Sequence, residues 1–526
     1  MLKEIITANR HHAYRLLQCL TVASRPLSVE ELAEILVIDF DGTKEGIPEL
    51  KEDWRLKDEQ EAVLSTCSSL IAVVDDGAHR VVQFSHFSVK EFLTSDRLAT
   101  SSADVSHFHI PPEPAHTVIV EACLGILLQS DNGVGDAKVN RGSPLAKYAA
   151  QHWVDHAQFG KVSTSVEDGM RRLFDLAKPH FAAWLKLHDI DTIWDNFANY
   201  GNNIRGSPLY YASLCGFRDL AAHLVDEHPQ HVNARVGRNE SPLAAALLNK
   251  HFHIVELLHQ RGANVGIRDG KNRTLLHAAS VHGFVDMAQW LFAHGADANS
   301  RDKSRETPLH LAAVNGRIEF VRMLLRHGII VNARNKDHRT SLHLACEGGH
   351  VEIVRLLLEH GADVATRDLT HSMPLHLASS NGSPKVARLL IEHGVDVNAM
   401  DGSCRTPLHL ASSGVSIKTL RLLLQHRADL KGQKDSYSLA YHEGKPSANA
   451  ECVQALLDHG ADVTARDDTH STPLHLASSK ESPEIARLLI EHGAYVNALD
   501  ENRKTPLHLA SSEVSVKAAR LLLHTA

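Results

Sequence analysis

A short motif, T-P-L-H in its fullest form, recurs at a fixed spacing through the C-terminal part of this 526-residue chain. Its second letter falls at positions 208, 242, 275, 308, 341, 374, 407, 440, 473 and 506, so the first step is 34 residues and every later step is 33. A spacing held over ten units is typical of repeat architectures and is foreign to an ordinary globular domain. The chain is therefore predicted to stack copies of one structural unit.

The unit at 302–334 contains the local signals that the other copies share. Thr307 is suited to cap a helix, and Pro308 fits the first helical position, where its missing N–H is not needed. Gly316 breaks this helix, and apolar residues at helical spacing predict a second helix that Gly328 ends. One unit cannot bury its apolar face alone, so neighbouring units must stack. The expected fold class is mainly α, a solenoid of about ten helix pairs with extended fingers between them.

These residues carry a resemblance to a known family. The motif T-P-L-H-L-A, a following glycine and the segment E-I-V-R-L-L-L-E-H-G-A-D at 352–363 resemble the ankyrin repeat. The resemblance covers residues 201–526 and includes a degenerate repeat around 435–465. It implies an L-shaped stack of helix pairs with projecting β-hairpin fingers, which binds partners along its concave side.

The late repeats are close copies of one another. Residues 367–401 nearly equal residues 466–500, three units later, which indicates a block copied within the gene. The chain stops at L-L-L-H-T-A, inside the second helix of its last unit. Two explanations remain open at this stage: the last helix caps the array, or the chain is truncated.

Residues 10–100 do not repeat and show a different order of elements. Helices are expected at 11–23, at 28–36 with Ser28 as its N-cap, and at 57–70, followed by strands at 70–74 and 80–84. Three helices followed by a hairpin is the order of a winged helix. Core positions are expected just after it, at Phe87, Phe92 and Leu93.

Residues 101–200 are predicted to form an all-helical linker domain with Trp153, Trp184 and Trp194 in its core. Together with Y-A-A-Q-H-W-V-D-H-A at 148–157, residues 10–160 resemble the region between the NTPase and the repeats of fungal NACHT-type (STAND) ankyrin proteins. That family carries a nucleotide-binding module with a G-x-x-x-x-G-K-[ST] loop. The sequence contains no such loop. The chain therefore resembles this family without its NTPase domain. The nucleotide-driven switching of the family is not expected for this chain.

Composition restricts the environment and the partners. The formal net charge is -8 and the pI is near 6.6, so no general attraction to nucleic acid or to anionic membranes is expected. The stretch 52–61, where a groove-reading helix would start, holds more acidic than basic residues, which argues against DNA binding. Seven scattered cysteines indicate a reducing compartment. We expect a monomer in the cytoplasm, with the nucleus as an alternative.

The chain has 38 histidines, and the repeats explain many of them. One histidine lies in the T-P-L-H motif of most units, and we expect it to hydrogen-bond backbone at the base of a finger. A second series precedes the glycine after the second helix and favours the helix C-terminus. His152 and His156 have a spacing that can hold zinc but lack the glutamate of H-E-x-x-H. No metal site, cofactor site or catalytic residue is predicted.

The candidate partner-binding residues lie on the fingers and at the ends of the first helices. The resemblance implies contacts there, and the third to fifth units are basic in the fingers. The competing interpretation is a solvated charged face. If the surface is functional, it would bind an acidic or phosphorylated protein. The candidates are Lys271, Arg273, His282, Lys303, Ser304, Arg305, Glu306, Asn315, Lys336, Asp337 and Arg339.

Three functions fit these observations. The first is a non-enzymatic protein-interaction scaffold that binds a partner through the concave face and the finger tips. The second is the C-terminal sensor or regulatory part of a STAND signalling NTPase whose nucleotide-binding module is absent from this chain. The third is a transcriptional regulator that acts through the winged helix.

Overall fold

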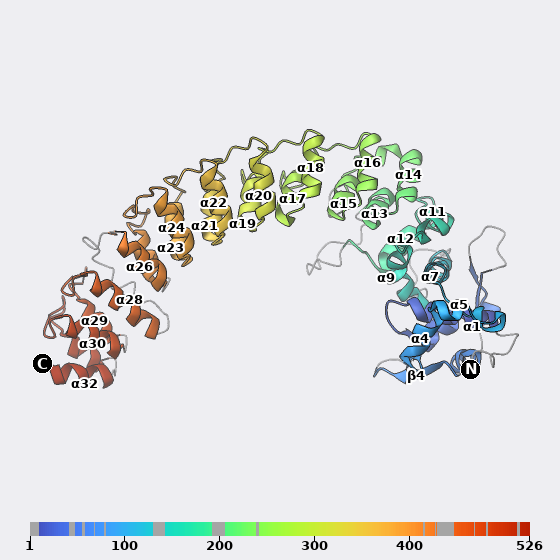
Figure 1. Ribbon diagram of the computed structural model, residues 1–526, viewed down its shortest axis with the longest axis horizontal. Helices are drawn as coiled ribbons and strands as arrows, with labels where there is room; N and C mark the ends of the chain where they lie inside the picture. The colour runs from blue at the N-terminus through green and yellow to red at the C-terminus, as the bar shows by residue number, and fades with distance from the viewer. Residues whose placement is uncertain are drawn as a thin grey trace. The chain divides into compact units, whose positions relative to one another are not determined.

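The protein is described here by a computed structural model, which is mainly helical (Figure 1). It describes residues 10–40, 48–54, 58–67, 69–77, 80–129, 143–191, 206–237, 241–413, 416–426, 428, 446–467, 469–479, 482–512 and 516–525. Trp194 and the first half of the degenerate repeat lie outside these ranges. The chain divides into two compact units, Met1–Val265 and Gly266–Ala526. The first two helix pairs of the repeat region therefore group with the N-terminal segments.

The N-terminal segment has the element order of a winged helix. Helices α1 (Arg10–Val22), α2 (Val29–Leu36) and α3 (Glu59–Cys67) precede the hairpin of β4 (Ile71–Asp75) and β5 (Arg80–Phe84). The short strand β1 (Leu27–Ser28) pairs with β5, which gives an antiparallel sheet of order β1-β5-β4. A second antiparallel pair joins β2 (Ile38–Asp39) to β3 (Glu49–Leu50), and a 3-10 turn, η3 (Glu52–Trp54), follows. The predicted order of helices and hairpin is confirmed.

Helix α2 starts where its sequence predicts. The Ser28 hydroxyl accepts a hydrogen bond from the Glu31 N–H at 3.2 Å, and the Glu31 carboxylate accepts one from the Ser28 N–H at 2.8 Å. This reciprocal capping box satisfies two backbone donors that the helix itself cannot pair. The Glu31 carboxylate also accepts two hydrogen bonds from Arg25.

The core prediction after the hairpin is partly wrong. Leu93, at the end of α4 (Phe87–Leu93), is buried, but Phe87 is 70% exposed and Phe92 is 42% exposed. Helix α4 has only seven residues and packs against β5 and the short helix α5 (Asp96–Ala99). So short a helix covers little surface, and the side that carries Leu93 takes the contact. Burial here depended on which elements lie beside α4, which local sequence does not specify.

A helical segment follows the winged helix and encloses two tryptophans. Trp153 and Trp184 are fully buried, with ring centroids 5.3 Å apart in an edge-to-face arrangement. The indole N–H of Trp184 donates to the Ala150 carbonyl at 3.0 Å. Both predictions of core positions are confirmed. The helices are α6 (Ala103–Ser106), α7 (Pro112–Leu127), α9 (Leu145–Ala157), α10 (Val162–Ser165), α11 (Glu167–Leu173) and α12 (His180–Leu187).

This helical segment covers the first helix pair of the repeat region. The Phe217 ring stacks on Trp153 at 5.5 Å, and the Tyr211 ring meets Trp184 at 6.1 Å. The Tyr211 hydroxyl donates to the Asp189 carboxylate at 2.8 Å. An apolar end face of a repeat array normally needs a cap. Aromatic side chains of the linker supply that cap here.

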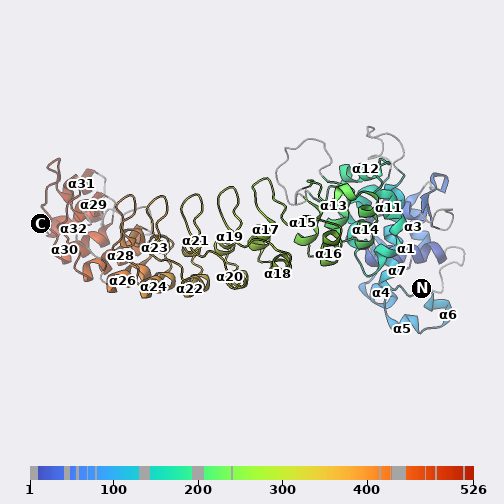
Figure 2. The same ribbon diagram turned by 90° about the horizontal axis from the view of Figure 1, so that it is seen from above.

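Within each of the two compact units, the described helix pairs of the repeat region stack in sequence order, first helix against first helix and second against second (Figures 1 and 2). In Met1–Val265 the pairs are α13 (Pro208–Cys215) with α14 (Arg218–Glu227), then, after η4 (Pro229–His231), α15 (Pro242–Leu248) with α16 (Phe252–Gln260). In Gly266–Ala526 the helices are α17 (Leu275–His282), α18 (Val285–Ala293), α19 (Pro308–Val314), α20 (Ile318–Leu325), α21 (Ser341–Glu347), α22 (Val351–Glu359), α23 (Pro374–Ser380), α24 (Pro384–Glu392), α25 (Pro407–Ser413), α26 (Ile417–Gln425), α28 (Pro446–Asp458), α29 (Pro473–Ser479), α30 (Pro483–Glu491), α31 (Pro506–Ser512) and α32 (Val516–Thr525).

Local signals position the start of α19 as predicted. Thr307 is the N-cap of α19 and Pro308 is its first residue. Gly316 and Gly328 adopt left-handed conformations, with φ of 69° and 65°, which favour glycine. Helix α20 ends at Leu325, before the glycine that was predicted to end it.

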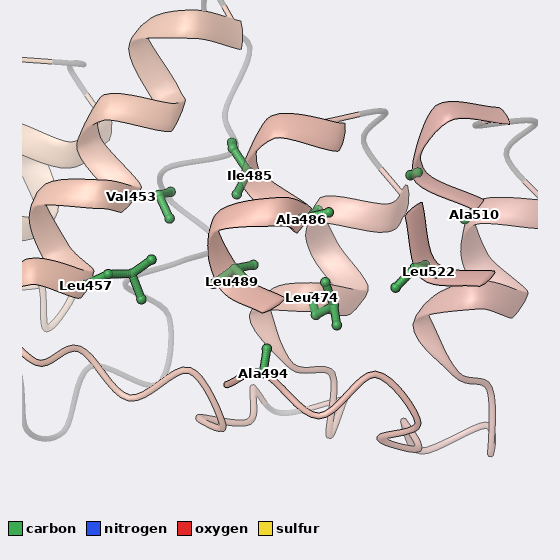
Figure 3. Close-up of a cluster of buried hydrophobic side chains, with 11 residues drawn as sticks. Val453, Leu457, Leu474, Ile485, Ala486, Leu489, Ala494, Ala510 and Leu522 are labelled. Atoms are coloured by element: carbon green, nitrogen blue, oxygen red, sulfur yellow. The ribbon is translucent and has the colours of Figure 1, made fainter. Parts of the chain in front are cut away.

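The core between the pairs is made of leucine, isoleucine, valine and alanine. Ala312 is fully buried in α19, and Ala477 is fully buried in α29. Such small side chains let neighbouring first helices approach closely. Figure 3 shows the same packing at α28 to α32, where Leu457, Ile485 and Leu489 point into one cluster. Burial of this kind contributes about 25 cal/mol per Å² of apolar surface removed from water.

Candidate partner-binding surface

Each finger tip is a tight loop closed by one acidic or amide side chain. In the tip 302–306, the Asp302 carboxylate accepts hydrogen bonds from the N–H groups of Ser304 and Glu306, both at 2.8 Å. Arg305 lies between them with φ of 60°, in the left-handed region. The same side-chain-to-backbone arrangement closes the tips at Asp269, Asn335, Asp368, Asp401 and Asp467.

Neighbouring finger tips are joined by backbone hydrogen bonds. The Lys303 N–H donates to the Lys271 carbonyl at 2.9 Å, and the Lys336 N–H donates to the Ser304 carbonyl at 2.8 Å. The same bond recurs from Leu369 to Asp337 and from Gly402 to Thr370, at 3.0 and 2.8 Å. Figure 2 shows these fingers as a row of loops beside α17, α19, α21 and α23. The row therefore presents its side chains from a fixed backbone.

The motif histidine ties each finger to the next one. The Nδ1 atom of His310 accepts from the Thr307 N–H at 3.2 Å, and its Nε2 atom lies 3.1 Å from the Arg339 carbonyl. Because Nδ1 accepts, Nε2 carries the proton and donates. Burial lowers the pKa of His310 to about 4, so its ring is neutral. His277, His343, His376 and His475 bond the carbonyls of Glu306, Ser372, Arg405 and Lys504 in the same way.

This geometry confirms that the motif histidines are structural, and it adds that each reaches the following repeat. The second histidine series is structural as well. The Nδ1 atom of His327 lies 2.9 Å from the Met323 carbonyl, four residues earlier. The same contact occurs at His294, His360, His393, His459 and His492.

Comparison with known families agrees with this geometry. The family model described as "Ankyrin repeats (3 copies)" matches residues 209–302, 275–368, 366–434 and 442–526. The chain belongs to the ankyrin-repeat family. A second model, "GPI inositol-deacylase, winged helix domain", matches residues 2–105.

Two curated proteins are similar to parts of this ankyrin-repeat protein. "Azaphilone pigments biosynthesis cluster protein L" of Monascus ruber is 30% identical over 270 residues, which cover 48% of this chain and 55% of that protein. "Alpha-latrocrustotoxin-Lt1a" of Latrodectus tredecimguttatus is 37% identical over 70 residues, which cover 13% of this chain and 5% of the toxin. The chain thus spans about half of the first relative and a small part of the second. Among the helices of the described residues, none is long and apolar enough to cross a membrane.

The basic residues of the ankyrin fingers fall into two groups. Arg273 pairs with Asp269 at 2.9 Å. Arg339 pairs with Glu347 at 3.0 Å and with the buried carboxylate of Asp368 at 3.2 Å. By contrast, the described part of the chain shows no ion pair for the exposed residues Lys271, Lys303, Arg305 and Lys336.

The other candidate residues also differ in what they contact. Burial raises the pKa of Glu306, and its carboxylate hydrogen-bonds to Asn335 in the next finger. The Asn315 amide donates to the Leu311 carbonyl at 2.8 Å and ends α19, and the His282 ring stacks on Phe284 at 5.2 Å. Ser304 and Asp337 are exposed at their tips. All the candidate residues therefore lie on the fingers or at the ends of first helices. Several of them already contact other residues of the protein.

Two features of this surface were not predicted. An arginine just before the finger tip bonds backbone in the next finger: Arg367 donates to the Met400 carbonyl at 2.6 Å, and Arg466 to the Leu499 carbonyl at 2.7 Å. The sequence contained a signal for these bonds, because an arginine recurs directly before the tip aspartate. Leu369, at the tip that follows the three lysine-bearing tips, is 57% exposed.

Of the two linker histidines, His156 takes part in a hydrogen-bond chain, whereas the His152 ring lies 3.7 Å from the Asp155 carboxylate. The Nε2 atom of His156 lies 2.8 Å from the Tyr148 hydroxyl, and its Nδ1 atom lies 2.9 Å from Nδ1 of His116. Burial lowers the pKa of His156 to about 4. The described residues include no group of three or more histidine, cysteine, aspartate or glutamate side chains arranged to hold a metal ion.

Proposed function

We propose that this chain is a non-enzymatic interaction scaffold in which ten ankyrin repeats bind a protein partner through the finger tips and first-helix ends. The family assignment supports a protein-interaction role. The observation that carries the proposal is the set of exposed cations Lys271, Lys303, Arg305 and Lys336, for which the described contacts include no ion pair and which lie on a hydrogen-bonded row of fingers. Charged side chains that satisfy no partner within the fold are available to a ligand.

The partner expected for this surface is acidic or phosphorylated. Residues 301–350 hold nine Lys and Arg against five Asp and Glu, an excess that the chain as a whole lacks. We also propose that the protein acts as a monomer in the cytoplasm, with the nucleus as an alternative. Its free cysteines, six of them buried, support a reducing compartment.

The proposal is tested by charge reversal on the full chain. Tagged wild-type protein and a Lys303→Glu, Arg305→Glu, Lys336→Glu variant are used for proximity labelling in native cells, and each candidate partner is then purified. Binding is measured by calorimetry with both proteins. We expect the variant to lose at least tenfold in affinity for a true partner. A matched control, Lys385→Glu, Arg388→Glu, Lys418→Glu, reverses three exposed charges on second helices and should bind normally. Equal loss in both variants, or in neither, contradicts the proposal.

A second candidate function is supported by the winged-helix match at 2–105. The chain would then be the sensor or regulatory part of a STAND signalling protein, with the linker coupling its winged helix to the repeats. The packing of Phe217 on Trp153 supports such a coupling. The test is a search for a phosphate-binding loop in the genomic sequence upstream of this chain, together with ATP-binding measurements on the purified protein. Tight ATP binding by this chain would contradict the simple scaffold.

A further inference from the structure

Three successive finger tips present different chemistry at one equivalent position. The position directly after the tip aspartate or asparagine is Lys303, then Lys336, then Leu369. Both lysines are exposed, and Leu369 is 57% exposed. Along the row, the exposed side chain at this position therefore changes from basic, at the two lysines, to apolar, at the leucine.

The backbone holds these three positions in register. The N–H groups of all three residues donate to carbonyls of the preceding finger, at 2.9, 2.8 and 3.0 Å. The spacing of the fingers follows the stacking of the helices, whose axes lie about 8–10 Å apart in packed pairs. A peptide in the polyproline II conformation has three residues per turn and advances about 3.1 Å per residue, so every third side chain lies on the same side, about 9 Å further along. The period of the finger row therefore matches every third residue of a polyproline II chain.

We infer, on the basis of the proposed function, that the fingers bind an acidic segment of the partner in the polyproline II conformation with the pattern acidic-x-x-acidic-x-x-apolar. The two carboxylates pair with Lys303 and Lys336, and the apolar side chain covers Leu369. The intervening residues face away from the row. Ser304 and Asp337 lie between these positions, on the same backbone path.

The surface favours a peptide over a nucleic acid. Carboxylates lie among the lysines, at Asp337 and Asp368 in the fingers and at Glu347 at the end of α21, and Asp368 and Glu347 already pair with Arg339. A phosphate backbone carries closely spaced charges and needs a continuous cationic path. The row offers separate cations followed by an apolar position, which suits single carboxylates and one apolar side chain.

Fluorescence anisotropy with the full chain and labelled synthetic peptides tests this inference. One peptide contains D-S-T-D-S-T-L between serine flanks, and its control, D-S-D-S-L with the same flanks, keeps the composition of the key residues but shortens their spacing. We expect the first peptide to bind at least fivefold more tightly, and raised salt to weaken it. Equal binding of the two peptides would overturn the inferred pattern.

Variants separate the two kinds of contact. Lys303→Glu with Lys336→Glu should weaken the first peptide at least tenfold, and Leu369→Ser about threefold, while Lys385→Glu with Arg388→Glu leaves it unchanged. Duplex DNA or RNA that binds through the same lysines more tightly than the peptide would also overturn the inference. If the peptides fail while the purified partner still requires Lys303 and Lys336, the scaffold function stands and only the acidic pattern is wrong.

Discussion

The Nε2 atom of His310 lies 3.1 Å from the backbone carbonyl of Arg339, which belongs to the finger of the following repeat. The same ring accepts from the Thr307 N–H at the start of its own helix. One neutral imidazole thus connects the base of one finger to the tip of the next. The finger row that carries the proposed binding residues depends on these links.

Removing one link should loosen two fingers. His310→Ala deletes the ring's hydrogen bonds to Thr307 and Arg339 and leaves a cavity at a fully buried position, so we expect a loss of about 2–4 kcal/mol in local stability. Hydrogen exchange of the amides in residues 302–306 and 335–339 measures it. The matched change His327→Ala, at an exposed ring, should affect them little. Unchanged protection in His310→Ala would contradict the role of this histidine.

The array should become less stable in mild acid. Burial lowers the pKa of His310 and of His343 to about 4, and lowers the pKa of His277, His376 and His475 as well. The folded state favours the neutral rings, so this stability is complete above the unfolded pKa of about 6.5 and is lost as pH falls toward 4.

Thermal unfolding between pH 8 and pH 4 measures this effect. The double variant His310→Gln, His343→Gln should unfold at a lower temperature at pH 8 but show a weaker decline toward pH 4. A decline as steep as that of the wild type would show that other groups cause the acid sensitivity.

One finger tip can be made more stable by a single substitution. Cys404 has φ of 58°, a left-handed conformation that side chains other than glycine and asparagine adopt only at a cost of about 1–2 kcal/mol. Cys404→Gly should stabilise the tip by about 0.5–1 kcal/mol after the greater entropy of the unfolded glycine is counted. The neighbouring change Ser403→Gly serves as the control and should destabilise it. Differential scanning fluorimetry distinguishes the two.

The stability of the first helix pair should depend on the aromatic cap that the linker supplies. Trp153 is fully buried against Phe217 and Trp184, so Trp153→Ala is expected to cost about 3–5 kcal/mol. The loss should appear in hydrogen exchange of α13 and α14. Trp54→Ala removes a side chain that is 49% exposed and is expected to cost less than about 1 kcal/mol. Equal effects of the two changes would mean that the cap contributes little.

Local and periodic features could be predicted from the sequence. The start of α19 at Pro308, its end before Gly316 and the N-cap at Ser28 depend on a few adjacent residues, through the backbone preferences of proline and glycine and the side-chain hydrogen bond of serine. The period of 33 residues indicated stacking because an isolated unit cannot bury its apolar face. The structural role of the motif histidines followed from the same period.

Tertiary structure decided which side chains remain available for binding. Arg273 and Lys303 look alike as basic finger residues, but Asp269 engages Arg273, while the described contacts include no ion pair for Lys303. Arg339 is engaged by Asp368, 29 residues away, and Phe87 is exposed although Leu93 on the same helix α4 is buried. Sequence determined the repeat and the shape of each unit, since those depend on short-range bonding. The binding surface depends on which residues of neighbouring units come within reach of one another, and only the folded stack brings them together.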